Sequence, residues 1–135
     1  MTVEKAAPSG ANAPPDLRAA GLAALRAALP DVFPDGDINL RDGRFADELV
    51  EIGLVSVWGA LWSRDGLSSR DRSLVTLGIL IALHAETELR THFKIALTNG
   101  LTKDEIAEVI YHSCGYVGFP AAVAARTAAR EAFDA

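Results

Sequence analysis

Cysteine is almost absent from this sequence, since Cys114 is the only one in 135 residues. A single thiol excludes an internal disulfide, a CxxC redox pair and a zinc site built on cysteines. Long apolar runs are also missing. The densest stretch, Leu74 to Leu83, is about half of the roughly 20 residues that a membrane-spanning helix needs. It suits a buried helix, and we expect no membrane partner.

Charge of one sign is not concentrated anywhere in the chain. The 13 basic and 18 acidic residues are interleaved and leave a net charge of -5. Without a Lys/Arg cluster that could follow a phosphate backbone, nucleic acid is not an expected partner. The first ten residues contain one lysine and no apolar block, so we expect no secretory signal and a cytoplasmic location.

The sequence does contain apolar residues at helical spacing. Half of all residues are apolar, which is sufficient for the core of one domain. Residues 1–15 hold three prolines among mainly small residues, and we interpret them as a disordered tail before a domain over 16–135. The periodicity predicts an all-α fold of about six helices. Their expected ranges are 17–29, 43–62, 68–83, 86–98, 103–114 and 120–133.

Several helix ends carry recognisable signals. Ser68 precedes Asp71 by three residues, and Thr102 precedes Glu105 by three, which are capping-box patterns. Gly100 is expected to end the fourth helix. The helix over 68–83 is apolar nearly all round, so it should lie in the middle of the fold or of an oligomer.

Two glutamate–histidine pairs are the main candidate chemical groups. Glu88 precedes His92 by four residues, and Glu108 precedes His112 by four. Residues four apart share a helix face, so the carboxylate can orient the imidazole and raise its pKa. Each pair is a candidate general acid or base, although a solvated helix pair has the same pattern.

A metal site and a cysteine nucleophile fit the pattern less well. His84, Glu88 and His92 are spaced by four, but successive positions turn about 40° around the helix, so one ion cannot easily reach all three. Cys114 lies two residues after His112, so the side chains point apart and a small buried thiol is the better interpretation. We expect neither a metal nor a cofactor.

Two further residue types are candidates for binding or packing. Arg72 immediately precedes the most apolar helix, so it is the best candidate for a partly buried group that binds an anion by a bidentate contact. Trp58 and Trp62 are four residues apart and are expected to fill the core or an interface.

Three stretches of the chain resemble motifs of the carboxymuconolactone decarboxylase family. They are LWSRDGL with RDRSLVT over 61–76, the segment 88–112 that begins ELRTH, and YVGFPAA over 116–122. The likeness covers about residues 45–132. In the related alkylhydroperoxidase D branch, a CxxC pair precedes a histidine that matches His92, but Ala85 and Glu88 stand at the cysteine positions here. The resemblance therefore implies the decarboxylase branch.

What this resemblance implies is a cofactor-free, alkylhydroperoxidase D-like helical subunit that assembles as a ring-shaped homo-oligomer, commonly a trimer or hexamer. The implied reaction is decarboxylation of an unsaturated carboxylated lactone, of the gamma-carboxymuconolactone type, in aromatic-compound degradation. The lactone takes up the electrons as a dienolate, so the protein must only hold the carboxylates, stabilise charge and return a proton. Arg72, with Arg90, would hold a carboxylate. His92, oriented by Glu88, would serve as proton donor or oxyanion stabiliser, and His112, with Tyr116 nearby in the chain, would be the second such group. The departing carboxylate should meet only weak, apolar contacts, because a firm ion pair would oppose its loss.

The assignment requires the two imidazoles to converge on one sheltered cavity, and other functions stay open. The same fold can act on another lactone or keto acid as a hydrolase, isomerase or dehydratase. A non-catalytic helical assembly would have unperturbed histidines and no small-molecule pocket. Peroxide reduction through Cys114 alone would lack a resolving thiol.

Overall fold

The structure is a computed structural model of the chain, and it describes residues 16–135. Every regular element in that range is helical, which confirms the predicted all-α fold. The elements are α1 (Leu17–Ala28), α2 (Leu49–Gly53), η2 (Leu54–Trp62), α3 (Ser69–Ala82), α4 (Glu86–Thr98), α5 (Lys103–Val117) and α6 (Phe119–Asp134). Because α2 runs directly into the π-helix η2, the described residues form six rods. The tail expected at 1–15 lies outside the described residues.

The predicted end signals are used as expected. The Ser68 hydroxyl accepts from the Asp71 N–H at 3.1 Å and caps α3. Thr102 and Glu105 form a complete capping box at the start of α5, with both bonds at 3.1 Å. Gly100 follows α4 with φ +100°, a backbone conformation that suits glycine.

Two predicted boundaries are wrong. The rod expected from residue 43 begins only at Leu49. The Asp47 carboxylate instead accepts from the Gly43 N–H and from Arg41, both at 3.1 Å, and this local network competes with helix formation. Phe45, which lies in this loop, is fully exposed. At the other end of the chain, α5 continues through the expected stop and ends at Val117.

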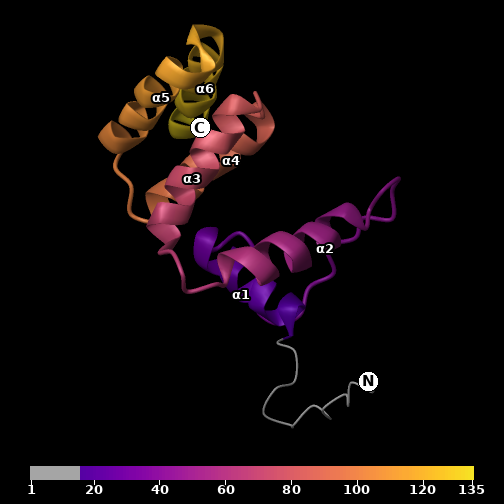
Figure 1. Cartoon of the computed structure of the whole chain (residues 1–135). Helices are drawn as coiled ribbons and strands as arrows, with labels where there is room; N and C mark the ends of the chain where they lie inside the picture. The colour runs from indigo at the N-terminus through magenta and orange to yellow at the C-terminus, as the bar shows by residue number, and fades with distance from the viewer. Residues whose placement is uncertain (1–15) are drawn as a thin grey trace, which may run out of the picture.

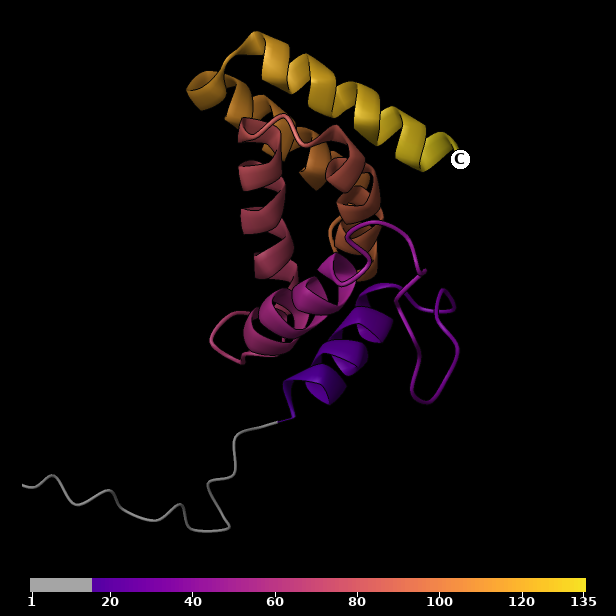
Figure 2. The ribbon, with the colours of Figure 1, turned by 90° about the vertical axis from the view of Figure 1, so that its right-hand side faces the viewer.

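The helices form two lobes with separate cores (Figures 1 and 2). In the N-terminal lobe, α1 packs along η2. In the C-terminal lobe, α3, α4, α5 and α6 pack on one another, with α6 on the side away from the N-terminal lobe. The first core is centred on Leu22, Leu25 and Leu54, while the larger second core includes Leu77 and Phe93.

Two glycines allow the close approach of α1 and η2. A Cβ atom on Gly21 would overlap the backbone carbonyl of Leu54, and one on Gly59 would overlap the carbonyl of Leu17. Since these obstacles are backbone atoms, no side chain can move aside to make room. The glycines therefore fix the position of η2 on α1, and with it the position of the tryptophans on η2.

Among the described residues, 16–135, helix α3 is covered on only one side. Leu77 and Ile81 are fully buried in the C-terminal core, whereas Val75, Ile79 and Leu83 are 54%, 53% and 68% exposed. The expectation of a central helix is therefore confirmed within the fold for one face of α3, and burial of the other face in an oligomer stays a prediction.

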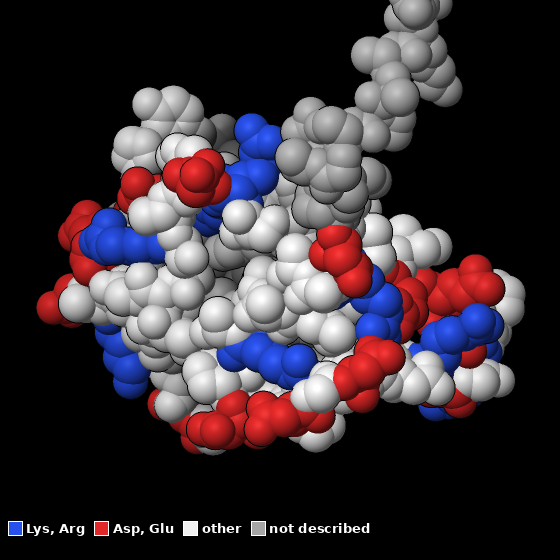
Figure 3. All heavy atoms as spheres, turned by 90° about the horizontal axis from the view of Figure 1, so that it is seen from below, with Lys and Arg blue, Asp and Glu red and all other residues white. Residues whose placement is uncertain are grey.

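The outer surface shows no basic stripe on the face drawn in Figure 3, where acidic and basic side chains are interspersed around uncharged ones. No helix within residues 16–135 combines the length and the apolar character required to cross a bilayer.

Candidate active site

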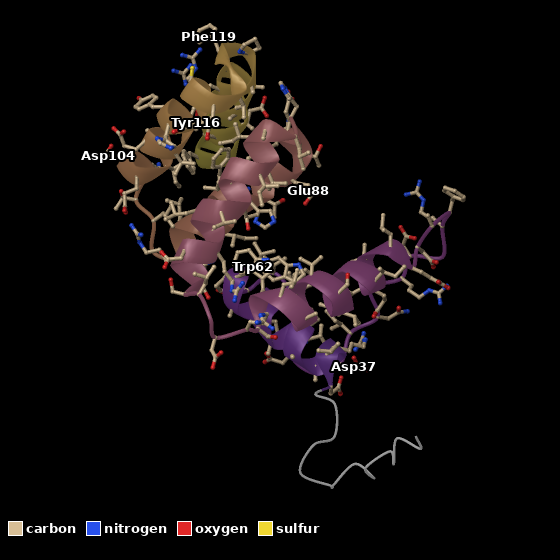
Figure 4. The ribbon with its side chains drawn as sticks, in the orientation of Figure 1. Asp37, Trp62, Glu88, Asp104, Tyr116 and Phe119 are labelled. Atoms are coloured by element: carbon tan, nitrogen blue, oxygen red, sulfur yellow. The ribbon has the colours of Figure 1, made fainter. Side chains whose placement is uncertain are left out.

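A pocket of about 450 Å³ lies where the two lobes meet, and we call it the interlobe pocket. Its walls come from η2, α3 and α4. Arg72, Thr76 and Leu80 line it from α3 at a spacing of four residues, and Glu88 and His92 line it from α4 at the same spacing. Figure 4 shows Trp62 and Glu88 on opposite sides of the space between the lobes. Helical periodicity thus gathers the polar groups on the two faces that oppose η2.

Two indole rings hold the imidazole of His92. The Trp58 and His92 rings are stacked with centroids 6.1 Å apart and planes within 5°, and Trp62 stacks on His92 at 6.1 Å and 28°. The two indoles stack on each other at 4.9 Å. Burial among these rings lowers the pKa of His92 below its ordinary 6.5, and the negative charge of Glu88 opposes this shift. The imidazole is therefore neutral at neutral pH.

The Nδ1 atom of His92 is buried without a hydrogen-bond partner. Glu88 does not hold this nitrogen, and its influence on the ring is through charge at a distance. Packing against Trp58 and Trp62 is the contact that orients the ring. Because a buried polar atom normally has a partner, this unpartnered nitrogen makes His92 a candidate group for contact with a ligand.

Arg72 presents a second open donor. One terminal nitrogen, Nη2, donates to the carbonyl oxygen of Arg64 at 3.0 Å, which ties the guanidinium to the loop before α3. Its Nε is buried and has no partner. Arg72 is also the only cationic side chain among the described residues that line the interlobe pocket. A bound carboxylate could accept from Nε.

Three residues expected at the site lie elsewhere in this chain. Arg90 donates to Glu131 of α6 at 2.5 Å and does not line the pocket. His112 and Tyr116 are exposed on α5 with ring centroids 5.1 Å apart, and Figure 4 places Tyr116 away from Trp62 and Glu88. The expected convergence of both imidazoles on one cavity is thus wrong for the single chain.

Residues that the sequence reasoning did not assign to the site are Trp58, Trp62 and Thr76. The two tryptophans were expected to fill a core or an interface, but they form one wall of the pocket. Their spacing of four residues indicates that they share a helix face, but not what that face contacts. The position of Thr76 one turn after Arg72 was a usable signal, because both must lie on the same face of α3.

Metal-binding geometry is not found around the histidines. Within the described part of the chain, no three His, Cys, Asp or Glu side chains gather as they would around an ion. His84 is exposed and follows the end of α3 with φ +54°.

Comparison with known proteins places this chain in a family. The sequence model of the carboxymuconolactone decarboxylase family matches residues 53–131, which is more than half of the chain. The chain belongs to this family. The matched range includes every residue that lines the interlobe pocket. Six helical rods without strands over residues 16–135 agree with the alkylhydroperoxidase D-like subunit that family membership implies.

Two relatives carry names that state a reaction. The chain is 50% identical over 76 residues to a 4-carboxymuconolactone decarboxylase of Acinetobacter baylyi, covering 56% of this chain and 57% of the relative. It is 43% identical over 68 residues to a nitrosuccinic acid decarboxylase of Metarhizium robertsii, covering 50% of this chain and 48% of the relative. The matches therefore span about half the length of these curated relatives.

Proposed function

We propose that this protein is a decarboxylase that acts on a small carboxylate in the interlobe pocket. The observation that carries the proposal is that Arg72 and His92 line one cavity and that each has a buried nitrogen without a hydrogen-bond partner, Nε of Arg72 and Nδ1 of His92. One is suited to bind a carboxylate, and the other belongs to a proton-transfer group. Membership of the carboxymuconolactone decarboxylase family and two relatives named as decarboxylases support the same reaction type.

The proposed substrate carries its own electron sink beside the departing carboxylate. This feature is shared by a carboxylated unsaturated lactone and by nitrosuccinic acid, the compounds in the relatives' names. The first choice is a lactone of the gamma-carboxymuconolactone type, as in aromatic-compound degradation. Its lactone carbonyl accepts the electron pair through the conjugated double bond, so the reaction requires no cofactor.

Arg72 holds the carboxylate that is retained. Its guanidinium is already positioned by the bond to the Arg64 carbonyl, so little reorganisation is needed when Nε donates to the substrate. The carboxylate that departs should lie against the apolar side of the pocket, near Val57, Leu61 and Val75. An ion pair at that position would stabilise the ground state and oppose the loss of carbon dioxide.

His92 supplies the proton. In the free protein its ring is neutral, but an anionic substrate beside it, together with Glu88, favours the imidazolium form. The C–CO₂ bond then breaks, its electron pair moves through the double bond to the carbonyl oxygen of the lactone, and carbon dioxide leaves. The imidazolium stabilises the resulting dienolate, returns its proton to carbon and becomes neutral again. The cycle consumes one proton from solvent, as the overall reaction requires.

The direct test measures turnover of the carboxylactone and of nitrosuccinate by the purified protein, with released carbon dioxide as the readout. We expect His92→Ala to lower kcat by about 100- to 10,000-fold, the usual contribution of a general acid or base. His112→Ala is the matched comparison, because both histidines follow a glutamate by four residues. Turnover that survives His92→Ala at full rate would reject the proposal. An equal loss of kcat in His112→Ala would support the assignment made from the sequence, in which both imidazoles take part in the reaction.

The rival interpretation as a non-catalytic assembly is less well supported. It requires unperturbed histidines and no small-molecule pocket, whereas His92 has a lowered pKa and lines the interlobe pocket. A homo-oligomer, a trimer or hexamer, and a cytoplasmic location stay predictions from the sequence.

A further inference from the structure

Thr76 carries the only hydroxyl among the described residues that line the interlobe pocket. It is half-buried and lies one turn after Arg72 on α3. In the proposed reaction, the oxygen of the dienolate that bears the charge and the carbon that is protonated are different atoms. One N–H of the His92 imidazolium cannot point at both atoms at once, so the oxygen requires a donor of its own.

The hydroxyl of Thr76 is available to donate. Hydroxyls within helices commonly donate to the carbonyl four residues earlier, and Ser56, Ser113 and Thr127 do so at 2.6, 2.7 and 3.1 Å. Thr76 forms no such bond to Arg72, whose own side chain donates to the loop before α3, nor to another group in the described part of the chain. Unlike the two buried nitrogens of the pocket, its oxygen is accessible.

The packing of α3 on α4 places Thr76 between the two groups assigned to the reaction. The two helices are antiparallel, and Asn99 at the end of α4 donates to Ser73 near the start of α3 at 3.0 Å. His92 lies seven residues before Asn99, so its level on α3 is about seven residues after Ser73. At 1.5 Å per residue, Arg72 is roughly 12 Å from that level along the axis, and Thr76 is about midway. A substrate that reaches from Arg72 to His92 must pass Thr76.

We propose that the Thr76 hydroxyl donates a hydrogen bond to the substrate oxygen on which negative charge develops, a lactone carbonyl oxygen or a nitro oxygen. This inference rests on the proposed function. When the C–CO₂ bond breaks, its electron pair reaches this oxygen, and the hydroxyl keeps its proton while it stabilises the new anion. The electron pair then forms the new C–H bond with the proton from His92, and the oxygen is neutral again.

A neutral donor suits this position. A cation would bind the anionic substrate strongly before the reaction, whereas a hydrogen bond from a hydroxyl strengthens as its acceptor becomes charged. Glu88 cannot take this role, because an ionised carboxylate has no donor. The indole N–H groups of Trp58 and Trp62 are neutral donors, but stacking on His92 fixes both rings, so these groups cannot turn toward a substrate as a hydroxyl can.

Thr76→Val removes the hydroxyl and keeps the β-branched shape. We expect kcat for the carboxylactone to fall about 100-fold, the usual cost of losing one oxyanion donor, with KM nearly unchanged. Thr76→Ser keeps the hydroxyl and should retain most of the wild-type kcat. Thr91→Val is the matched control, because Thr91 is exposed on α4 and does not line the pocket. It should leave both constants unchanged.

The dependence of kcat on pH separates this role from proton transfer. A hydroxyl that keeps its proton adds no titrating group, so the residual activity of Thr76→Val should have the pH profile of the wild type. A raised KM with unchanged kcat would instead show contact with the retained carboxylate and overturn the inference. A loss in Thr76→Ser as large as that in Thr76→Val would overturn it as well, because the hydroxyl would then not be the group that matters.

A binding measurement tests the hydroxyl without turnover. Loss of carbon dioxide from nitrosuccinate leaves the nitronate of 3-nitropropionate, which is also formed when 3-nitropropionate is ionised in base. Rapid mixing follows the binding of the nitronate and of the nitro compound through quenching of Trp58 and Trp62, the two tryptophans of the chain. We expect the wild type to prefer the nitronate. Thr76→Val should lose about tenfold or more of this preference, since a hydrogen bond to a charged acceptor is the stronger one, and Thr91→Val should keep it.

The two proposals fail in different ways. A nitronate preference that Thr76→Val leaves unchanged overturns the role of the hydroxyl, even in a protein that is an active decarboxylase. A wild-type protein that turns over neither the carboxylactone nor nitrosuccinate rejects the proposed function, and the nitronate preference then decides by itself whether Thr76 stabilises an anion in the pocket.

Discussion

Replacement of Arg72 by glutamine would measure how much the interlobe pocket depends on one guanidinium. The change removes the buried Nε, which has no partner in the free protein, and the positive charge beside it. A hydrogen bond to a charged group contributes about 1.5–3 kcal/mol, and at 1.36 kcal/mol per tenfold this corresponds to a loss of about 10- to 150-fold in kcat/KM. The kcat/KM of Arg72→Lys should lie between those of the wild type and of Arg72→Gln, because lysine keeps the charge but not the planar set of donors.

The assay is steady-state decarboxylation of the lactone, with kcat and KM determined separately. Since the retained carboxylate is bound in the ground state and the transition state alike, most of the loss should be a raised KM. Arg70→Gln is the matched control, because it makes the same chemical change two residues earlier, where Arg70 pairs with Glu105 outside the pocket. Equal effects of the two variants on KM, or no effect of Arg72→Gln, would refute the role of Arg72 in binding.

Three further variants probe the proton donor His92, the contact between α1 and η2, and Arg90. Because folding lowers the pKa of His92, the unfolded state binds more protons than the folded state just below pH 6.5, so the free energy of unfolding should fall as pH drops from about 6.5 toward the folded pKa. In urea unfolding across that pH window, His92→Gln should lose this part of the pH dependence. An unchanged dependence of the free energy of unfolding on pH in His92→Gln would contradict the lowered pKa. Gly59→Ala should destabilise the protein by about 1–3 kcal/mol in the same assay, because its methyl group overlaps the Leu17 carbonyl. Gly78→Ala has open space and serves as its control; equal effects would disprove the close contact. Arg90→Gln should change stability by less than about 0.5 kcal/mol and leave kcat/KM intact, because its pair with Glu131 is exposed; a raised KM would restore it as a substrate contact.

Most of the fold could be predicted from local signals. The capping box at Thr102 and the glycine after α4 act within one turn, so the sequence alone specifies these ends. The start of the α2–η2 rod could not be placed in this way, because Asp47 binds groups on residues 41 and 43 and stabilises a loop that apolar periodicity does not reveal.

The candidate site was predicted only in part. Glu88 and His92 share a helix face by spacing, and Arg72 precedes α3, so these three could be proposed from the sequence. That they meet depends on how α3 packs on α4 and on how η2 is set against both. The same packing leaves His112 on the outside of α5, although its local sequence pattern equals that of His92.

By itself the sequence determined the helices, their order and the family, because periodicity, caps and motifs are properties of neighbouring residues. Only the tertiary structure decided which glutamate–histidine pair is buried. The reason is that burial between Trp58, Trp62 and His92 joins residues about 30 positions apart, and desolvation, unlike helix formation, depends on what the rest of the chain places around a group.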